Sequence, residues 1–236
     1  MATIEDEAAG STAGAPRLTE VAYRQLLDMI LNGALEAGAI VQERRLAKAL
    51  SVSRTPLRDA LFRLEGEGFL IRRGEGALQV KTVTLEDYTH ALRVRITLER
   101  EAARLAAGNL PTAHLLAIRG RIEAILAAAQ AADGPQPTRV DLDEVDDMLH
   151  DAIAAASGNP LLADLIRSVR LRSRLFGLER RPSRIQQIGA EHLALLDALA
   201  AGDPVAAAQA MERHLGNVLD DLRLRIFDPR AHGAQG

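Results

Sequence analysis

The chain contains no cysteine and no tryptophan, and its aromatic residues make up only 3% of the sequence. Without cysteine, disulfide scaffolds, thiolate zinc sites, iron–sulfur clusters and cysteine nucleophiles are excluded, so any metal must be held by His, Asp or Glu. Scarce aromatic rings argue against binding of single-stranded nucleic acid or sugars by stacking. The sequence also lacks a membrane-spanning apolar run and the basic-then-apolar pattern of a signal peptide. We therefore expect a soluble cytoplasmic protein that does not enter a membrane.

The 236 residues, of which 47% are hydrophobic, suffice for one large domain or two small ones, and abundant Ala and Leu favour helices. The net charge of −3 is unevenly distributed. Residues 17–81 carry 11 basic and 8 acidic residues, and within 44–73 the count is 8 against 3, a local charge of +5. A short basic module therefore precedes a larger acidic one. By charge alone, the basic module is as consistent with a solvated helix face as with a nucleic-acid surface.

The basic module combines three expected helices with a hairpin. Residues 1–16 are small and acidic and are expected to form a disordered tail. Apolar spacing, capping residues and glycines then predict helices at 19–31, 43–50 and 53–65 and strands at 69–71 and 77–80. Two helices at a tight turn followed by a hairpin predict a winged helix-turn-helix domain over 17–81.

The rest of the chain is expected to be entirely helical. Caps, prolines and glycines delimit six predicted helices, at 84–108, 111–132, 140–157, 161–180, 183–201 and 204–226. We assign 84–226 to an all-α six-helix bundle and 227–236 to a second tail. The expected fold class is therefore mainly α, with an N-terminal winged helix-turn-helix domain.

The third expected helix presents Arg54, Thr55 and Arg58 from its first turns, where a recognition helix reaches base edges in the major groove. The segment ERRLAKALSVSRTPLRDALFRLEGEGFL resembles the winged-helix signature of GntR-type bacterial transcription regulators. The candidate DNA-binding residues, from this resemblance and from the basic hairpin, are Arg44, Arg45, Ser53, Arg54, Thr55, Arg58, Arg73, Gly74 and Gly76. Arg45 departs from the family pattern, which usually has an acidic or amide residue there. A winged helix used for protein contacts is the alternative.

Asp146 and His150 lie four residues apart and therefore leave one helix face about one turn from each other. That spacing alone is more often a surface pair than a metal site, and a single inward histidine is more often simply hydrogen-bonded. His192 and His214 add two more inward positions on predicted helices. Three histidines and one aspartate suit a divalent ion such as Zn²⁺, Ni²⁺ or Mn²⁺.

Three further segments resemble the signatures of the FCD ligand-binding domain of the FadR subgroup of GntR regulators: LRVRITLEREAARLAA, VDDMLHDAIAAASGNPLL and AEHLALLDALAAGDPVAAAQAMERHL. The resemblance implies a metal on Asp146, His150, His192 and His214 and an effector-binding arginine at Arg95. The remaining histidines, His90, His114 and His232, fall outside these motifs and are expected to be exposed.

The combined expectation is a ligand-responsive transcription regulator, acting as a repressor and as a homodimer on an inverted-repeat operator in double-stranded DNA. A small carboxylate would bind the metal and Arg95. Sequence signatures of a catalytic nucleophile, a phosphate loop or a dinucleotide site are absent, so we do not expect an enzyme. Two alternatives remain: a metal-dependent enzyme of the helical bundle, and an architectural DNA-binding protein with a structural metal.

Overall fold

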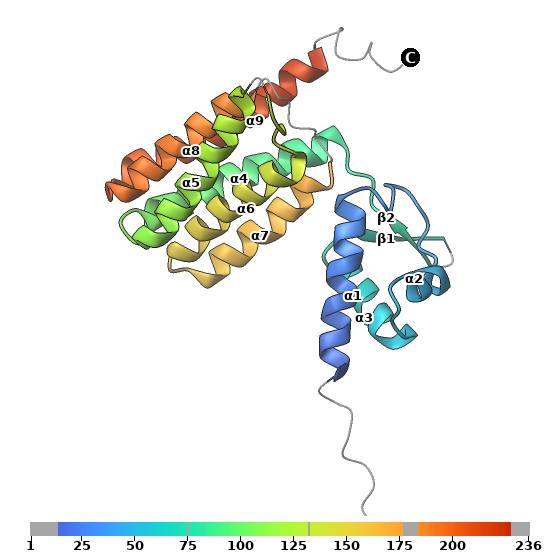
Figure 1. The fold of residues 1–236 in the computed structure, drawn as a ribbon. Coiled ribbons are helices and arrows are strands. Elements are labelled where there is room, and N and C mark those ends of the chain that lie inside the picture. The colour runs from blue at the N-terminus through green and yellow to red at the C-terminus, as the bar shows by residue number, and fades with distance from the viewer. Residues whose placement is uncertain (1–13, 75, 132, 177–183, 228–236) are drawn as a thin grey trace, which may run out of the picture. The chain divides into compact units, whose positions relative to one another are not determined.

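The computed structural model describes residues 14–74, 76–131, 133–176 and 184–227. The chain divides into two compact units, Met1–Val83 and Thr84–Gly236, which are described separately below. Figure 1 shows the elements of each unit with their labels. Among the described residues, no helix combines the length and apolarity needed to cross a bilayer.

The first unit has the winged helix-turn-helix architecture that the sequence predicts. Its elements are α1 (Gly14–Leu31), α2 (Glu43–Ala49), α3 (Arg54–Gly66), β1 (Leu70–Arg73) and β2 (Ala77–Val80). The turn between α2 and α3 is tight because Ser51 adopts a left-handed φ of 54°. Ser53 occupies the N-cap position of α3 in extended conformation, as expected, although its side chain makes no capping hydrogen bond.

The wing is an antiparallel hairpin with Leu70 opposite Val80 and Arg73 opposite Ala77. Gly74 and Gly76 have φ values of 51° and 107°, a region that favours glycine, so the hairpin needs both to reverse direction. A segment that the sequence did not single out joins the hairpin at its edge. There the Val41 amide donates to the Leu78 carbonyl at 2.8 Å.

A small apolar core holds α1 against α3 and the hairpin. Its most deeply buried members are Leu26, Leu57, Ala60, Leu61, Leu64, Phe69, Leu70 and Val80. At the edge of this core the Tyr23 hydroxyl donates to Glu67 at 2.6 Å, and the Arg63 guanidinium lies 3.6 Å from the centre of the Tyr23 ring. Burial, followed by the bond to Glu67, raises the pKa of Tyr23 to about 12.

The second unit contains the six expected helices. They are α4 (Leu85–Ala106), α5 (Thr112–Gln130), α6 (Arg139–Ala156), α7 (Pro160–Arg174), α8 (Ile185–Ala200) and α9 (Pro204–Phe227). Thr84 and Asp87 form the capping box expected at the start of α4. Thr138 and Asp141 form a second capping box before α6 that the sequence analysis did not identify.

Several predicted boundaries were wrong. The first helix begins at Gly14 and not near Thr19, so residues 14–16 belong to α1 and not to the tail, since Pro16 is tolerated in a first turn. The helix predicted at 161–180 ends at Arg174, and part of its predicted end lies outside the described residues. The first hairpin strand is Leu70–Arg73, one or two residues later than predicted. Residues 1–13 and 228–236 of the two predicted tails also lie outside the described residues.

The packing of the bundle determines which helix faces meet. Helix α4 contacts α6, α7 and α9, and α8 contacts α5 and α9. The core between them is almost entirely aliphatic, with Leu149, Ile153, Ile166, Leu195, Leu199 and Met211 among its most buried members. This arrangement directs one face each of α4, α6, α8 and α9 toward a common interior.

Candidate metal centre and nucleic-acid interface

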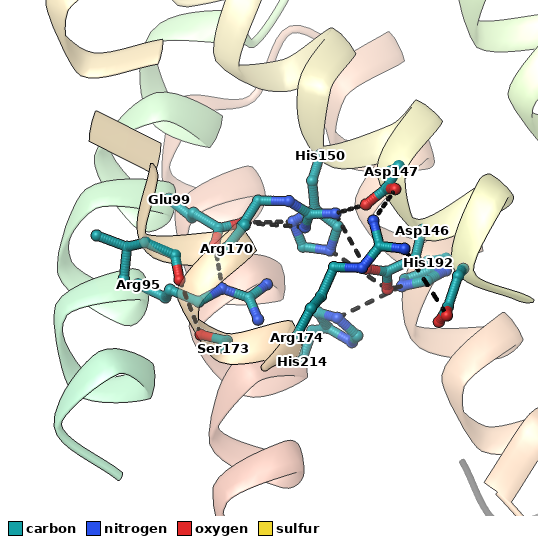
Figure 2. Close-up of polar contacts among 12 residues, drawn as sticks. Arg95, Glu99, Asp146, Asp147, His150, Arg170, Ser173, Arg174, His192 and His214 are labelled. Carbon is teal, nitrogen blue, oxygen red and sulfur yellow. Dashed lines mark hydrogen bonds and ion pairs between the residues drawn. The ribbon is translucent and has the colours of Figure 1, made fainter. Parts of the chain in front are cut away.

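Three helices bring four potential metal ligands together inside the bundle (Figure 2). Helix α6 carries Asp146 and His150, α8 carries His192, and α9 carries His214. One ligand atom from each of these residues lies within 4.8 Å of the others. The structure therefore gathers the four residues that the sequence analysis selected.

The distances within the cluster leave room for an ion among the side chains. The Asp146 Oδ1 lies 3.8 Å from His150 Nε2 and 3.7 Å from His192 Nε2. The Nε2 atoms of His192 and His214 are 3.4 Å apart. All three histidines are almost fully buried, while the Asp146 side chain is 13% exposed and forms the edge nearest to solvent.

The protonation of His150 follows from its surroundings. Burial, with the Arg170 charge acting in the same direction, lowers the pKa of His150 to about 4, so its imidazole is neutral at physiological pH. Its Nδ1 makes a very short contact with the Glu99 carboxylate of α4. Burial raises the pKa of Glu99, but Arg95 and His150 outweigh it and hold that pKa well below its usual range. Because the ionised carboxylate only accepts, Nδ1 carries the proton and Nε2 keeps its lone pair.

His214 is oriented in the same manner by a different carboxylate. Its Nδ1 lies 2.9 Å from the Glu191 carboxylate, which also accepts from the Asn217 amide at 2.8 Å. Burial raises the pKa of Glu191, but hydrogen bonds from His214 and Asn217 lower it overall. Carboxylates that hold the outer nitrogen of a ligating histidine fix its tautomer and increase its basicity. Glu99 and Glu191 thus aim two imidazole lone pairs inward.

The cluster fits a divalent ion by a specific test. The Nε2 of His150 is buried and has no hydrogen-bond partner among the described residues. An unsatisfied acceptor at such a position costs free energy unless a ligand completes it. Three imidazole nitrogens and one carboxylate form a donor set that suits borderline divalent metals, and cysteine is absent from the sequence.

Arg170 of α7 is a part of the site that sequence reasoning missed. Its Nη2 donates to Asp146 Oδ2 at 3.1 Å and to Asp147 Oδ1 at 2.7 Å. Asp147 in turn accepts from Arg174 at 2.7 Å. Arg170 therefore holds the Asp146 oxygen that is not turned toward the histidines and fixes the orientation of this ligand. Only the buried position of Arg170, which tertiary packing decides, marks it as functional.

Arg95, the predicted effector residue, lies beside the cluster on α4, as Figure 2 shows. Its side chain is 10% exposed, and its Nε donates to Glu99 Oε1 at 2.6 Å. Within the described residues, no hydrogen bond occupies its two terminal amino groups. Arg95 is thus connected to the metal cluster through Glu99 and His150, while two of its donor groups remain open to a ligand.

The predicted DNA-binding residues are nearly all exposed on the first unit. Arg44, Arg45, Ser53, Arg54, Thr55, Arg58, Arg73 and Gly74 are exposed, and Gly76 is half-buried. The Arg58 Nε donates to Glu43 at 2.9 Å, and the Arg73 Nε donates to Gln79 at 3.0 Å. Both pairs are exposed, so a phosphate competes with them at little cost.

The other histidines do not belong to the candidate metal cluster. His90 and His114 are exposed, as predicted, and His232 lies outside the described residues.

A winged helix-turn-helix unit with several exposed arginines, followed by a helical bundle around a buried polar centre, is the architecture of a DNA-binding regulator with a ligand-sensing domain. Comparison with protein families agrees. Residues 18–80 match the model described as bacterial regulatory proteins of the gntR family, and residues 90–217, more than half of the chain, match the FCD domain. The chain therefore belongs to the GntR family and is a transcription regulator with an FCD effector domain.

Individual relatives support this assignment along most of the chain. The regulator LutR of Bacillus subtilis is 31% identical over 220 residues, which cover 82% of this chain and 96% of LutR. The "Probable D-xylose utilization operon transcriptional repressor" of Paenarthrobacter nicotinovorans is 28% identical over 191 residues, covering 80% of this chain and 82% of that one. The solved structure of Escherichia coli McbR/YncC is similar with a TM-score of 0.73 and 26% identity, covering 89% of this chain and 98% of that one.

Proposed function

We propose that the protein is a transcriptional repressor and a metal-dependent sensor of a small organic acid, whose binding changes the affinity of the protein for its operator. The observation that carries this proposal is the convergence of Asp146, His150, His192 and His214 within 4.8 Å, with the His150 Nε2 left without a partner among the described residues. Zn²⁺, Ni²⁺ and Mn²⁺ are the ions that this donor set suits. When bound, the ion would supply an electrophilic centre for carboxylate and hydroxyl oxygens.

The side chains around the centre favour an anionic ligand. Arg95 offers two open amino groups next to the cluster and would form paired hydrogen bonds with a carboxylate. Arg170, which pairs with Asp146 and Asp147, and Arg174, which pairs with Asp147, add two positive charges near the cluster. A small carboxylate with a second oxygen donor, such as a hydroxyacid, matches both the metal and Arg95.

For the first unit we propose that Arg54, Thr55 and Arg58 read base edges while Arg44, Arg45 and Arg73 hold phosphates. Ser53, Gly74 and Gly76 would place backbone and hydroxyl groups close to the DNA. A homodimer would match an inverted-repeat operator, since the two-fold axis of the protein and that of the site coincide. Binding to chromosomal DNA implies that the protein works in the cytoplasm.

The metal assignment is tested by elemental analysis of the protein purified from medium supplemented with Zn²⁺, Ni²⁺ and Mn²⁺. We expect about one ion per chain, and we expect that His192→Ala or His214→Ala loses most of it. His114→Ala, an exposed histidine of α5, is the matched control and should retain the ion. A wild-type protein without metal would refute the assignment.

The sensing step is tested by fluorescence anisotropy on an operator obtained by in vitro selection from random duplexes. Lactate, malate and citrate serve as probes, and we expect that at least one changes the affinity of the wild-type protein for DNA. Arg95→Ala should retain the metal and lose this response, because it contacts the acid and not the ion. Conversion of an acid into product would favour a metal-dependent enzyme, and DNA affinity unaffected by any acid would favour an architectural protein.

A further inference from the structure

One aromatic side chain on the DNA-binding unit has no role in the core. Phe62 of α3 is 73% exposed, the largest exposed fraction among the large hydrophobic side chains of the described residues. The opposite side of the same helix is fully used, since Leu57, Leu61 and Leu64 are buried. A single exposed apolar residue is ordinary on a protein surface. The position of Phe62 makes this one informative.

Phe62 shares a helix face with the proposed DNA contacts. It follows Arg58 by four residues and Thr55 by seven, so the three side chains form one stripe along α3. A spacing of seven residues leaves Thr55 and Phe62 only about 20° apart around the helix axis. A DNA surface that contacts Thr55 and Arg58 therefore also comes close to Phe62, two turns after Thr55 on the same helix.

A cleft of about 490 Å³ opens beside Phe62, between α3 and the wing. Arg58 and Phe62 line it on the α3 side, and Arg72 and Gly76 line it on the hairpin side. Arg72 is held in place because its guanidinium donates to Glu65 at 2.8 Å and to the Gly76 carbonyl at 3.2 Å. The cleft thus combines one aromatic ring with two guanidinium groups, one on each wall, and with the carboxylates of Glu43, which accepts from Arg58, and of Asp59.

We propose that Phe62 packs against deoxyribose rings of the DNA strand that passes between α3 and the wing. The inference rests on the DNA-binding face proposed above. Phe62 lies eight residues beyond Arg54, about 12 Å along the helix axis, which is about the width of the major groove. At that distance α3 meets the groove edge, where the sugar–phosphate backbone runs.

The chemistry of the cleft fits a backbone segment. Arg58 and Arg72 are more than half exposed, so phosphates can compete with Glu43 and Glu65 for their donors. The Phe62 ring, which lines the same cleft, would face the sugars that join those phosphates. A sugar is identical at every base pair, so this contact contributes affinity without sequence preference. It also releases no counterion, because the phenyl ring carries no charge.

Phe62→Ala tests the proposal with the full-length protein and a fluorescein-labelled duplex of arbitrary sequence, about 30 base pairs long. Dissociation constants are measured by anisotropy between about 50 and 200 mM salt. We expect Phe62→Ala to bind about tenfold more weakly at every salt concentration, with an unchanged slope of log K against log salt. Leu18→Ala, which truncates an exposed residue of α1, should bind like the wild type. Arg72→Ala should instead reduce the slope by about one.

The same measurement on a selected operator completes the test. We expect the same fold-loss there, because the sugar contact does not depend on sequence. Unchanged binding by Phe62→Ala overturns the inference, as does a loss confined to the operator, which would place Phe62 on a base. A change in self-association without a loss of DNA affinity would assign Phe62 to a protein contact. If Arg58→Ala also binds normally, the proposed DNA-binding face itself is wrong.

Discussion

Replacing Glu99 by Gln tests the central electrostatic link of the bundle. The Glu99 side chain is 2% exposed and lies within ion-pair distance of Arg95, Arg170 and His150. Gln keeps the size of the side chain and one acceptor oxygen but removes the negative charge. Two buried guanidinium groups then lose a counterion, and Nδ1 of His150 loses its charged acceptor.

The expected cost follows from the burial of the partners. Removing one member of a buried ion pair costs about 3–5 kcal/mol, a large part of the roughly 5–15 kcal/mol that stabilises a typical domain. For a chain of this size, that loss lowers the melting temperature by about 6–20 °C. Because Glu99 also orients a proposed metal ligand, metal affinity should fall about 10–100-fold.

Glu101→Gln provides a matched control one half-turn further along α4. Glu101 pairs with Arg104 through two contacts of 2.7 and 2.8 Å, but both side chains are about half exposed. An exposed pair contributes about 0–1 kcal/mol, so the melting temperature should change by less than about 4 °C. Scanning calorimetry and competition with a chelating dye measure the two quantities. Equal effects of the two substitutions on melting temperature and metal affinity would show that Glu99 does not stabilise the buried ion pairs with Arg95, Arg170 and His150.

Three further outcomes follow from the structure. The fragment 84–236, which is a separate compact unit, should fold and dimerise without the first unit. Analytical sedimentation measures this, and a monomer at micromolar concentration would show that the dimer interface does not lie in this fragment. Gly189→Ala should destabilise the bundle by about 1–3 kcal/mol in urea unfolding, since the added Cβ would lie 2.5 Å from a Leu126 methyl carbon, whereas Gly120→Ala meets open space and should not destabilise it. Tyr23 should titrate near pH 12 by ultraviolet absorbance, and Tyr23→Phe should remove this step. Because the pKa of Tyr23 is higher in the folded protein, the unfolded chain loses the proton first, and the free energy of unfolding should fall as the pH rises above about 10.

Helix positions could be predicted because they depend on local spacing. The four candidate ligands could be selected because the spacing of Asp146 and His150, the inward positions of His192 and His214 and the resemblance to the FCD domain agree. The separation of Asp146 and His150 places them on one face in any helix, and Thr84 with Asp87 marks a helix start by its own chemistry. Boundaries were less certain where no capping residue dominates, as at the start of α1 and the end of α7.

The groups that orient the ligands could not be predicted. Arg95 and Glu99 are four residues apart, a spacing that is typical of an exposed helix pair. Only the packing of α4 against α6 buries Glu99 and places it against His150, 51 residues away in sequence. The same holds for Arg170, because Arg167 and Arg172 on the same helix are exposed and the sequence does not distinguish Arg170 from them. Tertiary contacts, which a single sequence does not reveal, make these residues part of the site.

The distribution of the ligands over the chain has a consequence for the order of folding. No helix carries more than two of them, and His192 and His214 come from helices that meet across a 22-residue separation. An unfolded chain therefore offers an ion at most a weak two-residue site on α6, and the four-residue site that we propose forms only after α6, α8 and α9 have docked. Three of the four proposed ligands are almost fully buried, so an ion held by them would leave slowly while the bundle stays closed. The rate at which a chelator strips the protein would thus measure how often the closed bundle opens.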